Sequence, residues 1–179
     1  MIADECRSTP DLSGSISQRV NGFDWQRIRE ELDEDGHAVL EKLLSPEECQ
    51  GIAALYTNED RFRTRIVMAR HGFGSGEYKY FRYPLPDLLA ELRSAVYAPL
   101  VPLANRWYEA VGIDARFPEH HARFVERCHS ASQTRPTPLL LRYGPGDYNC
   151  LHQDLYGEHV FALQLAMLLS SPGTDFTGG

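Results

Sequence analysis

The first part of the chain carries apolar residues three and four positions apart, which is the pattern of amphipathic helices. Asp24 is a suitable N-cap for one such helix, and Gly36 is placed to end it. Residues 1–22 are rich in Ser, Gly and Asp, so we expect a flexible N-terminus there. Further helices are predicted from Pro46, from Asp87, over 100–110 and over 119–128.

Strand patterns become frequent later in the chain. Two short runs, Arg65–Ala69 and Tyr78–Tyr83, flank the glycine-rich stretch HGFGSG and predict a long hairpin. Residues 160–169 are nearly all apolar, which is typical of a strand buried on both faces, although periodicity alone also permits a short helix. Other predicted strands are 37–40, 139–143 and 148–153. Helices followed by strands predict an α+β fold, with residues 23–179 as a single domain.

Composition limits the function classes. The net charge of −7 argues against a general polyanion binder, because neutralising phosphates needs a basic surface. The segment from Arg61 to Arg93 nevertheless holds seven bases against three acids and could be a locally basic, substrate-facing surface. The four cysteines include no C-x-x-C pair, which favours reduced thiols in a cytoplasmic protein. We see no signal peptide and no apolar run of membrane-spanning length, and therefore expect no membrane partner.

The stretch LLLRYGPGDYNCLHQD, residues 139–154, holds the candidate chemistry. Residues two apart on a strand face the same side, so His152 and Asp154 can converge on one ion while Gln153 points away. One imidazole and one carboxylate are two of the three protein ligands of the facial triad that holds Fe(II) in non-haem oxygenases. A bare H-x-D is common by chance, but here it follows an apolar strand and a Gly-Pro-Gly turn.

In these residues the chain resembles the 2-oxoglutarate/Fe(II) oxygenases of the prolyl-4-hydroxylase type. The similarity lies in R-Y-G-P-G, H-Q-D, the apolar run ending L-L-S, and F-T-G-G, between Tyr143 and Gly179. Gly36–Leu55 resembles the N-terminal strand and helix of the same superfamily. The resemblance implies N-terminal helices packed on an incomplete double-stranded β-helix, a jelly-roll or cupin-like fold, truncated after its third core strand.

The resemblance also implies a reaction. Fe(II) would be held by His152 and Asp154, 2-oxoglutarate would lie near Tyr143, and L-ascorbate would keep the iron reduced. Such an enzyme uses O2 to hydroxylate a C–H bond, here of a prolyl or peptidyl substrate, and releases succinate and CO2. No residue is assigned as a catalytic acid or base. The distal His and the Arg or Lys that binds 2-oxoglutarate lie beyond Gly179 in the family pattern, so this chain alone is expected to be inactive.

Two alternatives remain open. The pattern Y-G-P-G-x-x-x-x-L-H-Q-D is also similar to the metal strand of AlkB-like nucleic-acid demethylases, and EYKYFRYPLP resembles their substrate hairpin. Leu141 stands where those enzymes have asparagine, and F-T-G-G is closer to prolyl hydroxylases, so the sequence favours a peptide substrate. The second alternative is a non-catalytic pseudo-oxygenase scaffold that binds a partner and retains the H-x-D pair.

Other residues are weaker candidates. His159 is a possible third ligand, although it opens a different predicted strand. Cys150 is expected to be a packing thiol, since soft thiolate is unusual in this kind of iron site. Tyr80, Arg82 and Tyr83 line either a substrate channel or the outside of the hairpin. Three histidines are expected on a solvated helix surface, namely His120, His121 and His129.

Overall fold

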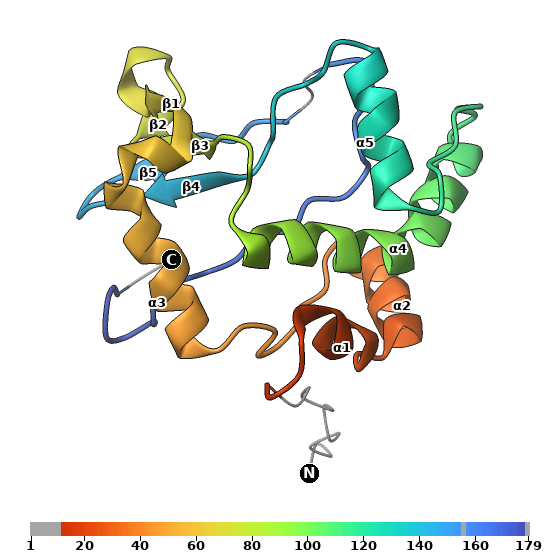
Figure 1. Ribbon diagram of the computed structural model, residues 1–179, viewed down its shortest axis with the longest axis horizontal. Helices are drawn as coiled ribbons and strands as arrows, with labels where there is room; N and C mark the ends of the chain where they lie inside the picture. The colour runs from red at the N-terminus through yellow and green to blue at the C-terminus, as the bar shows by residue number, and fades with distance from the viewer. Residues whose placement is uncertain (1–11, 155–156, 178–179) are drawn as a thin grey trace. The chain divides into compact units, whose positions relative to one another are not determined.

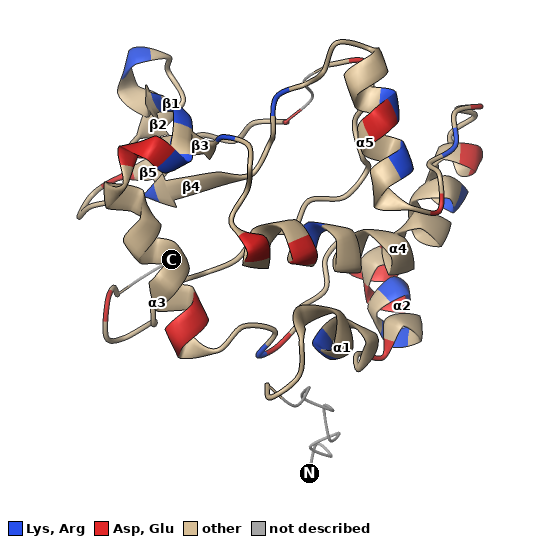
Figure 2. Ribbon diagram, viewed as in Figure 1, with Lys and Arg blue, Asp and Glu red and all other residues tan. Residues whose placement is uncertain are grey.

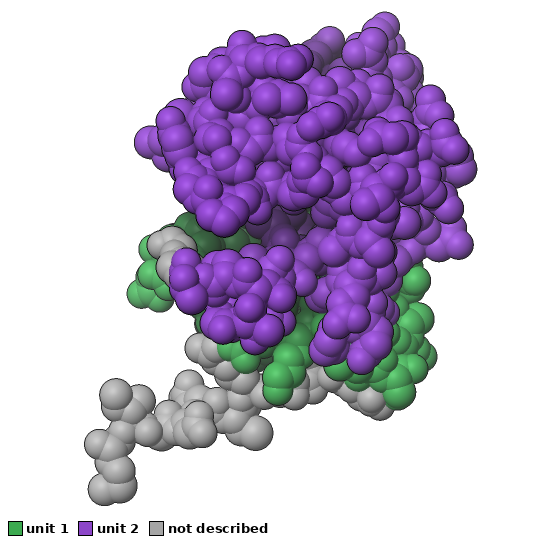
Figure 3. Space-filling view, turned by 90° about the vertical axis from the view of Figure 1, so that its left-hand side faces the viewer, with its two compact units in different colours: residues 1–45, 90–126, 161–164 green, residues 46–89, 127–160, 165–179 purple. Residues whose placement is uncertain are grey.

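The computed structural model describes residues 12–154 and 157–177, and Figure 1 shows its helices and strands. The chain forms two compact units, which Figure 3 distinguishes by colour. Unit 1 comprises Met1–Ser45, Ala90–Glu126 and Phe161–Gln164, and unit 2 comprises Pro46–Leu89, Arg127–Val160 and Leu165–Gly179. The combination of helices with antiparallel sheets confirms the α+β class. The boundaries of a single domain over 23–179 stay a prediction.

Helix α2 (Trp25–Asp35) in unit 1 follows its sequence signals closely. The Asp24 carboxylate accepts hydrogen bonds from the backbone N–H groups of Gln26 and Arg27, each at 3.1 Å. Gly36 ends the helix with φ 74°, in the left-handed region that glycine reaches without steric cost. Both ends were predictable because the capping groups are close in sequence to the backbone groups that they satisfy.

Helix α1 (Ile16–Asn21) lies inside the segment that the sequence analysis expected to be flexible. Ser15 and Gln18 form a capping box, and the apolar residues Ile16 and Val20, four positions apart, are both buried. The expectation is therefore wrong for these six residues. The polar composition of this segment suggested flexibility, but the capping box of Ser15 and Gln18 is a stronger local signal for a helix than composition is. Residues 1–11 lie outside the described part of the chain.

Helix α4 (Asp87–Ala110) is one helix of 24 residues where the sequence predicted two. Pro99 and Pro102 lie inside it, and each removes one backbone N–H from the helical ladder. Leu89, Leu92 and Val96 are buried, and burial continues past the prolines. An apolar stripe that is buried from Leu89 to Ala104 offsets the two lost hydrogen bonds, so the helix does not break.

Helix α5 (His121–Ser130) follows a segment that packs against α4 within unit 1. Tyr97, Val101, Ala104 and Phe117 form a buried cluster, with Tyr108, Phe124 and Phe161 packed against it. The ring centroid of Phe161 lies 4.9 Å from those of both Tyr97 and Phe117. Stacked and edge-to-face aromatic contacts of this kind add stability beyond the area that they bury.

Residues 160–169 do not form the predicted strand. They are irregular, and no described strand pairs with them. Phe161 packs on the aromatic cluster of unit 1, while Leu168, in unit 2, is exposed. A strand forms only where its backbone groups pair with a neighbouring strand. In an apolar run without such a partner, each side chain packs, or stays exposed, independently of the others. The short strand expected over 37–40 is absent for the same reason.

Unit 2 contains the hairpin that the sequence predicted. Strands β1 (Phe62–Val67), β3 (Glu77–Phe81) and β4 (Leu139–Arg142) form an antiparallel sheet in the order β1-β3-β4. A second, two-stranded sheet pairs β2 (Gly74–Ser75), in the glycine-rich tip, with β5 (Tyr148–Asn149). The strand expected over 148–153 is thus limited to two residues. The remaining elements are helix α3 (Pro46–Ala54) and the 3-10 turns η1 (Leu55–Thr57), η2 (Glu59–Arg61) and η3 (Met68–Arg70).

Among the described residues, none of the helices combines the length and the apolar character that crossing a membrane requires.

His121 departs from the expectation of a solvated histidine. It is half-buried, its ring lies 5.2 Å from that of Tyr97, and its Nδ1 hydrogen-bonds with the Ser94 hydroxyl at 3.1 Å. Burial, together with the positive charge of Arg93, lowers its pKa to about 4. His120 and His129 are exposed, as expected.

This lowered pKa predicts a pH dependence of stability. The unfolded chain binds a proton at His121 near pH 6.5 and the folded chain only near pH 4. Stability is therefore full well above pH 6.5 and falls as the pH drops toward 4. The full shift corresponds to about 3 kcal/mol, and partial exposure of the ring reduces the expected loss to on the order of 1–2 kcal/mol. Urea unfolding across this range should show a smaller pH dependence in His121→Gln than in the wild type, with His120→Gln as the control. Equal slopes in all three proteins would contradict the prediction.

Candidate metal centre and neighbouring pocket

The side chains of His152 and Asp154 lie on the same side of the chain, as the H-x-D spacing predicted. His152 Nε2 and Asp154 Oδ1 are 3.7 Å apart, and both side chains are a little under half exposed. They follow β5 in an irregular stretch rather than within a regular strand. The convergence therefore arises within an irregular stretch and not from a long ladder of hydrogen bonds.

The orientation of the His152 ring is held by its own backbone. Its Nδ1 lies 2.8 Å from the carbonyl oxygen of Cys150. A carbonyl can only accept a hydrogen bond, so Nδ1 carries a proton, and in the neutral ring the lone pair is on Nε2. A backbone carbonyl bonded to Nδ1 is the usual arrangement behind a metal-binding histidine. The lone pair is thus on the nitrogen nearer to the Asp154 carboxylate.

These two groups fit a first-row metal ion. Two donors bound to one ion at about 2.1 Å each lie at most about 4.2 Å apart, so the separation of 3.7 Å is compatible with sharing. No group of three His, Cys, Asp or Glu side chains that could hold a metal occurs among the described residues. In His159, the candidate third ligand, Nε2 lies 3.8 Å from Glu158 Oε1, and the backbone N–H donates a hydrogen bond to Gln133 Oε1. The structure thus brings together two potential ligands, and metal binding stays a prediction.

Tyr143, the candidate co-substrate residue, lines an open pocket of about 480 Å³. Burial and the negative charge of Asp147 both raise the pKa of the Tyr143 phenol, so it is a hydrogen-bond donor at neutral pH. The pocket therefore combines donors from Tyr143 and Arg142 with two carboxylates. Its lining residues are Gly76, Glu77, Arg142, Tyr143, Gly144 and Asp147. His152 and Asp154 are not among them, so the structure does not place the metal pair and Tyr143 in one cavity.

Asp147 ties the Gly-Pro-Gly turn to the hairpin tip. Its carboxylate accepts hydrogen bonds from the Ser75 hydroxyl and, at 2.8 Å, from the Gly144 backbone N–H. These two bonds hold its pKa below the ordinary value, so it is ionised at neutral pH. The Asp147 carboxylate thus anchors one wall of the pocket.

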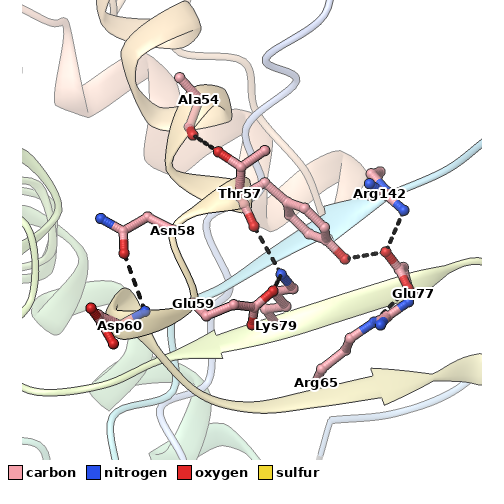
Figure 4. A network of polar contacts seen from close by, with 10 residues as sticks. Ala54, Thr57, Asn58, Glu59, Asp60, Arg65, Glu77, Lys79 and Arg142 are labelled. Atoms are coloured by element: carbon pink, nitrogen blue, oxygen red, sulfur yellow. Dashed lines mark hydrogen bonds and ion pairs between the residues drawn. The ribbon is translucent and has the colours of Figure 1, made fainter.

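A buried polar network, which the sequence analysis did not foresee, forms another wall (Figure 4). Glu77 is 8% exposed and Lys79 is 4% exposed. The Glu77 carboxylate accepts from Tyr56 Oη at 2.9 Å and from Arg65 Nε at 2.7 Å, and it forms an ion pair with Arg142 Nη2 at 2.7 Å. Lys79 Nζ donates to the Tyr56 carbonyl at 2.9 Å and to Glu59 Oε1 at 2.6 Å. Every buried charge in the network is paired, as burial demands.

The network controls the ionisation of its members. Burial alone would raise the pKa of Glu77, but hydrogen bonds from Arg65 and Tyr56 and the charges of Arg142 and Arg65 hold it below the ordinary value. Burial, followed by the hydrogen bond to Glu77, raises the pKa of Tyr56 to about 12. Glu77 is therefore a carboxylate and Tyr56 a phenol at neutral pH.

The network also pairs some of the charge of the basic segment Arg61–Arg93. Within the segment Arg65 binds Glu77 and Lys79 binds Glu59, so two of its seven bases are paired locally, and Arg142 from outside the segment also pairs with Glu77. Figure 2 shows acidic and basic residues interleaved around β1 and β3. The opposite face of β3 carries Tyr78 and Tyr80, both half-buried, with the Arg63 guanidinium 4.3 Å from the centroid of the Tyr80 ring. Of the other hairpin candidates, Arg82 and Tyr83 are exposed.

Comparison with known proteins places this chain in a family. Residues 76–179, more than half of the chain, match the family model Oxygenase-NA, described as "Oxygenase, catalysing oxidative methylation of damaged DNA". The uncharacterized proteins MT2286 and Rv2227 of Mycobacterium tuberculosis, from strains CDC 1551 and H37Rv, are each 46% identical to the chain over 99 residues. The match covers 55% of this chain and 42%, less than half, of each of those relatives. No solved structure matches the chain. The chain belongs to the Oxygenase-NA family of oxygenases.

Proposed function

We propose that the chain provides two metal ligands and part of the co-substrate pocket of an Fe(II)- and 2-oxoglutarate-dependent oxygenase that acts on nucleic acid. One observation carries the proposal: His152 and Asp154 converge to 3.7 Å, with the histidine lone pair on Nε2, inside the segment that matches the oxygenase family. The remaining ligand and the main 2-oxoglutarate cation would come from other parts of the full-length protein.

The residues present suit this chemistry. His152 and Asp154 would hold Fe(II), which, when bound, supplies the activation of O2 for oxidation of a substrate C–H bond. The overall reaction converts a C–H bond, 2-oxoglutarate and O2 into C–OH, succinate and CO2, with one oxygen atom in the alcohol and one in succinate. The Tyr143 phenol would donate a hydrogen bond to a carboxylate of 2-oxoglutarate, and Arg142, in the same pocket, would offset its charge.

The substrate class that we propose differs from the peptide substrate that the sequence favoured. The family description names damaged DNA, which supports the nucleic-acid alternative over a prolyl or peptidyl substrate. Tyr78, Tyr80 and the guanidinium of Arg63 also offer flat surfaces on which bases can stack. Base stacking needs no large positive surface, so the net charge of −7 is compatible with this substrate.

For the fold, we propose that the sheets of unit 2 form part of a double-stranded β-helix in the full-length protein. The antiparallel pairing of β1, β3 and β4 and the position of the H-x-D pair after β5 support this. The third ligand would then lie on a strand outside the residues described here, since these supply two.

The test is the formation of succinate from 2-oxoglutarate by the protein expressed from its complete reading frame. The assay contains Fe(II), ascorbate and O2, with either an N-methylated oligonucleotide, its unmethylated counterpart or a proline-rich peptide. We expect succinate release to rise at least about tenfold with the methylated oligonucleotide alone. Stimulation by the peptide alone would restore the prolyl-hydroxylase assignment. No succinate with any substrate, together with no Mn(II) binding, would favour the pseudo-oxygenase scaffold.

A further inference from the structure

The tip of the β1–β3 hairpin is joined to the chain immediately before the metal pair. Strand β2 pairs with β5 through Gly74↔Asn149 and Ser75↔Tyr148. One residue further on, the Cys150 N–H donates to the Phe73 carbonyl oxygen at 2.9 Å. The tip is remote in sequence from His152, yet it forms the ladder that ends two residues before it.

Gly74 is the closest point of this junction. Its φ is +118°, and a Cβ at this position would lie 2.2 Å from the Tyr148 carbonyl oxygen and 3.1 Å from the Cys150 nitrogen. Both neighbours are backbone atoms, which cannot rotate away as a side chain can. Any residue other than glycine would therefore force the chain at 148–150 away from the tip.

Cys150 transmits this constraint to the metal pair through its backbone. Its N–H is bonded to Phe73 in the tip, and its carbonyl oxygen accepts the hydrogen bond from His152 Nδ1. The same peptide segment thus touches the hairpin and orients the imidazole. A displacement of Cys150 would turn the ring and change the position of Nε2 relative to Asp154.

We infer that Gly74 is a positioning residue for His152: by allowing the hairpin tip to pack on residues 148–150, it sets the orientation of a metal ligand that it does not touch. This inference rests on the proposed metal-binding role of His152 and Asp154. It assigns the glycine-rich tip a function in metal affinity, in addition to any contact that the hairpin makes with substrate.

Three glycines of the same tip provide matched variants. Gly76 has the same φ of +118°, but the added Cβ would meet the Tyr143 side chain at 2.9 Å and the Arg142 carbonyl oxygen at 3.2 Å, neither of which belongs to residues 148–150. Gly72 has φ +71° with no atom within 4 Å. Gly74→Ala therefore combines strain with a backbone collision at the metal strand, Gly76→Ala has the strain without that collision, and Gly72→Ala has a milder strain only.

The experiment measures Mn(II) affinity of the full-length protein by electron paramagnetic resonance of the free ion, without O2. We expect Gly74→Ala to weaken binding by about tenfold or more, as loss of a group that orients a ligand does. Gly72→Ala and Gly76→Ala should stay within about threefold of the wild type. Binding by Gly74→Ala within that same range would overturn the inference.

Two further measurements keep the result interpretable. The ¹⁵N shifts of the His152 ring in metal-free protein should change in Gly74→Ala and not in Gly72→Ala, and unchanged shifts would overturn the positioning role. If the wild type itself binds no Mn(II), the proposed function fails, and these shifts still decide the inference. If Gly74→Ala does not fold, Ser75→Ala removes the Ser75–Asp147 bond at the same junction. Its Mn(II) binding should weaken by about fivefold or more, and an affinity within about threefold of the wild type would overturn the inference.

Discussion

His152→Ala and Asp154→Ala are each expected to weaken Mn(II) binding of the full-length protein by at least about 100-fold. Each change removes one of the two donors that converge to 3.7 Å, which costs more than losing a group that merely orients a ligand. Both side chains are nearly half exposed, so the melting temperature of the metal-free variants should stay close to that of the wild type. Titration calorimetry and a thermal melt measure the two effects separately.

His120→Ala is the matched control for this experiment. His120 is an exposed histidine just before α5, far along the chain from the H-x-D pair, and its loss should leave Mn(II) affinity unchanged. If His152→Ala and Asp154→Ala bind Mn(II) as tightly as His120→Ala does, the metal centre proposed here does not exist, and the scaffold alternative replaces it.

Glu77→Ala is expected to destabilise the protein by about 3 kcal/mol. The substitution leaves the buried Tyr56 hydroxyl without its acceptor and separates Arg65 and Arg142 from the carboxylate that neutralises them. Removing one partner of a buried ion pair typically costs about 3–5 kcal/mol, and the lower figure applies because both arginines can turn toward water. Urea unfolding at neutral pH measures the loss.

Glu59→Ala is a suitable control for Glu77→Ala. The Glu59 carboxylate pairs with Lys79, whose side chain is only 5% exposed, but the Glu59 side chain is itself 74% exposed. Removing Glu59 therefore opens the Lys79 ammonium to water, and we expect a smaller loss than for the buried Glu77. Equal losses of stability in the two variants would contradict the prediction that burial of Glu77 makes its removal more costly than that of Glu59. Lys79 keeps its bond to the Tyr56 carbonyl in both variants.

The contribution of the Glu77 carboxylate to stability should depend on pH in the acid range. Because the folded state lowers the pKa of Glu77, its contribution is present above the ordinary carboxyl pKa and is lost as the pH falls through the lowered one. The difference in stability between the wild type and Glu77→Ala should therefore shrink as the pH falls below about 4. A difference that stays constant down to the acid unfolding transition would contradict this assignment.

The alternation of residues along β3 defines two faces of the strand, but it does not determine which face is buried. The stretch E-Y-K-Y-F puts Glu77, Lys79 and Phe81 on one face and the two tyrosines on the other, and period two identifies these sets without a structure. Hydrophobicity would bury the tyrosines. The structure buries the charged set, because Tyr56, Glu59, Arg65 and Arg142 come from other elements to pair with it. Those partners are not adjacent in sequence, so no local pattern reports them.

What the sequence by itself determined is local: the ends of α2, the hairpin, the spacing that puts His152 and Asp154 on one side, and the oxygenase motif around them. Each depends on groups within a few residues of one another. Only the tertiary structure decided which face of β3 is buried, that residues 160–169 lack a strand partner, and that Gly74 packs against the chain beside Cys150. The physical reason is that burial, pairing and close approach depend on which distant segments become neighbours.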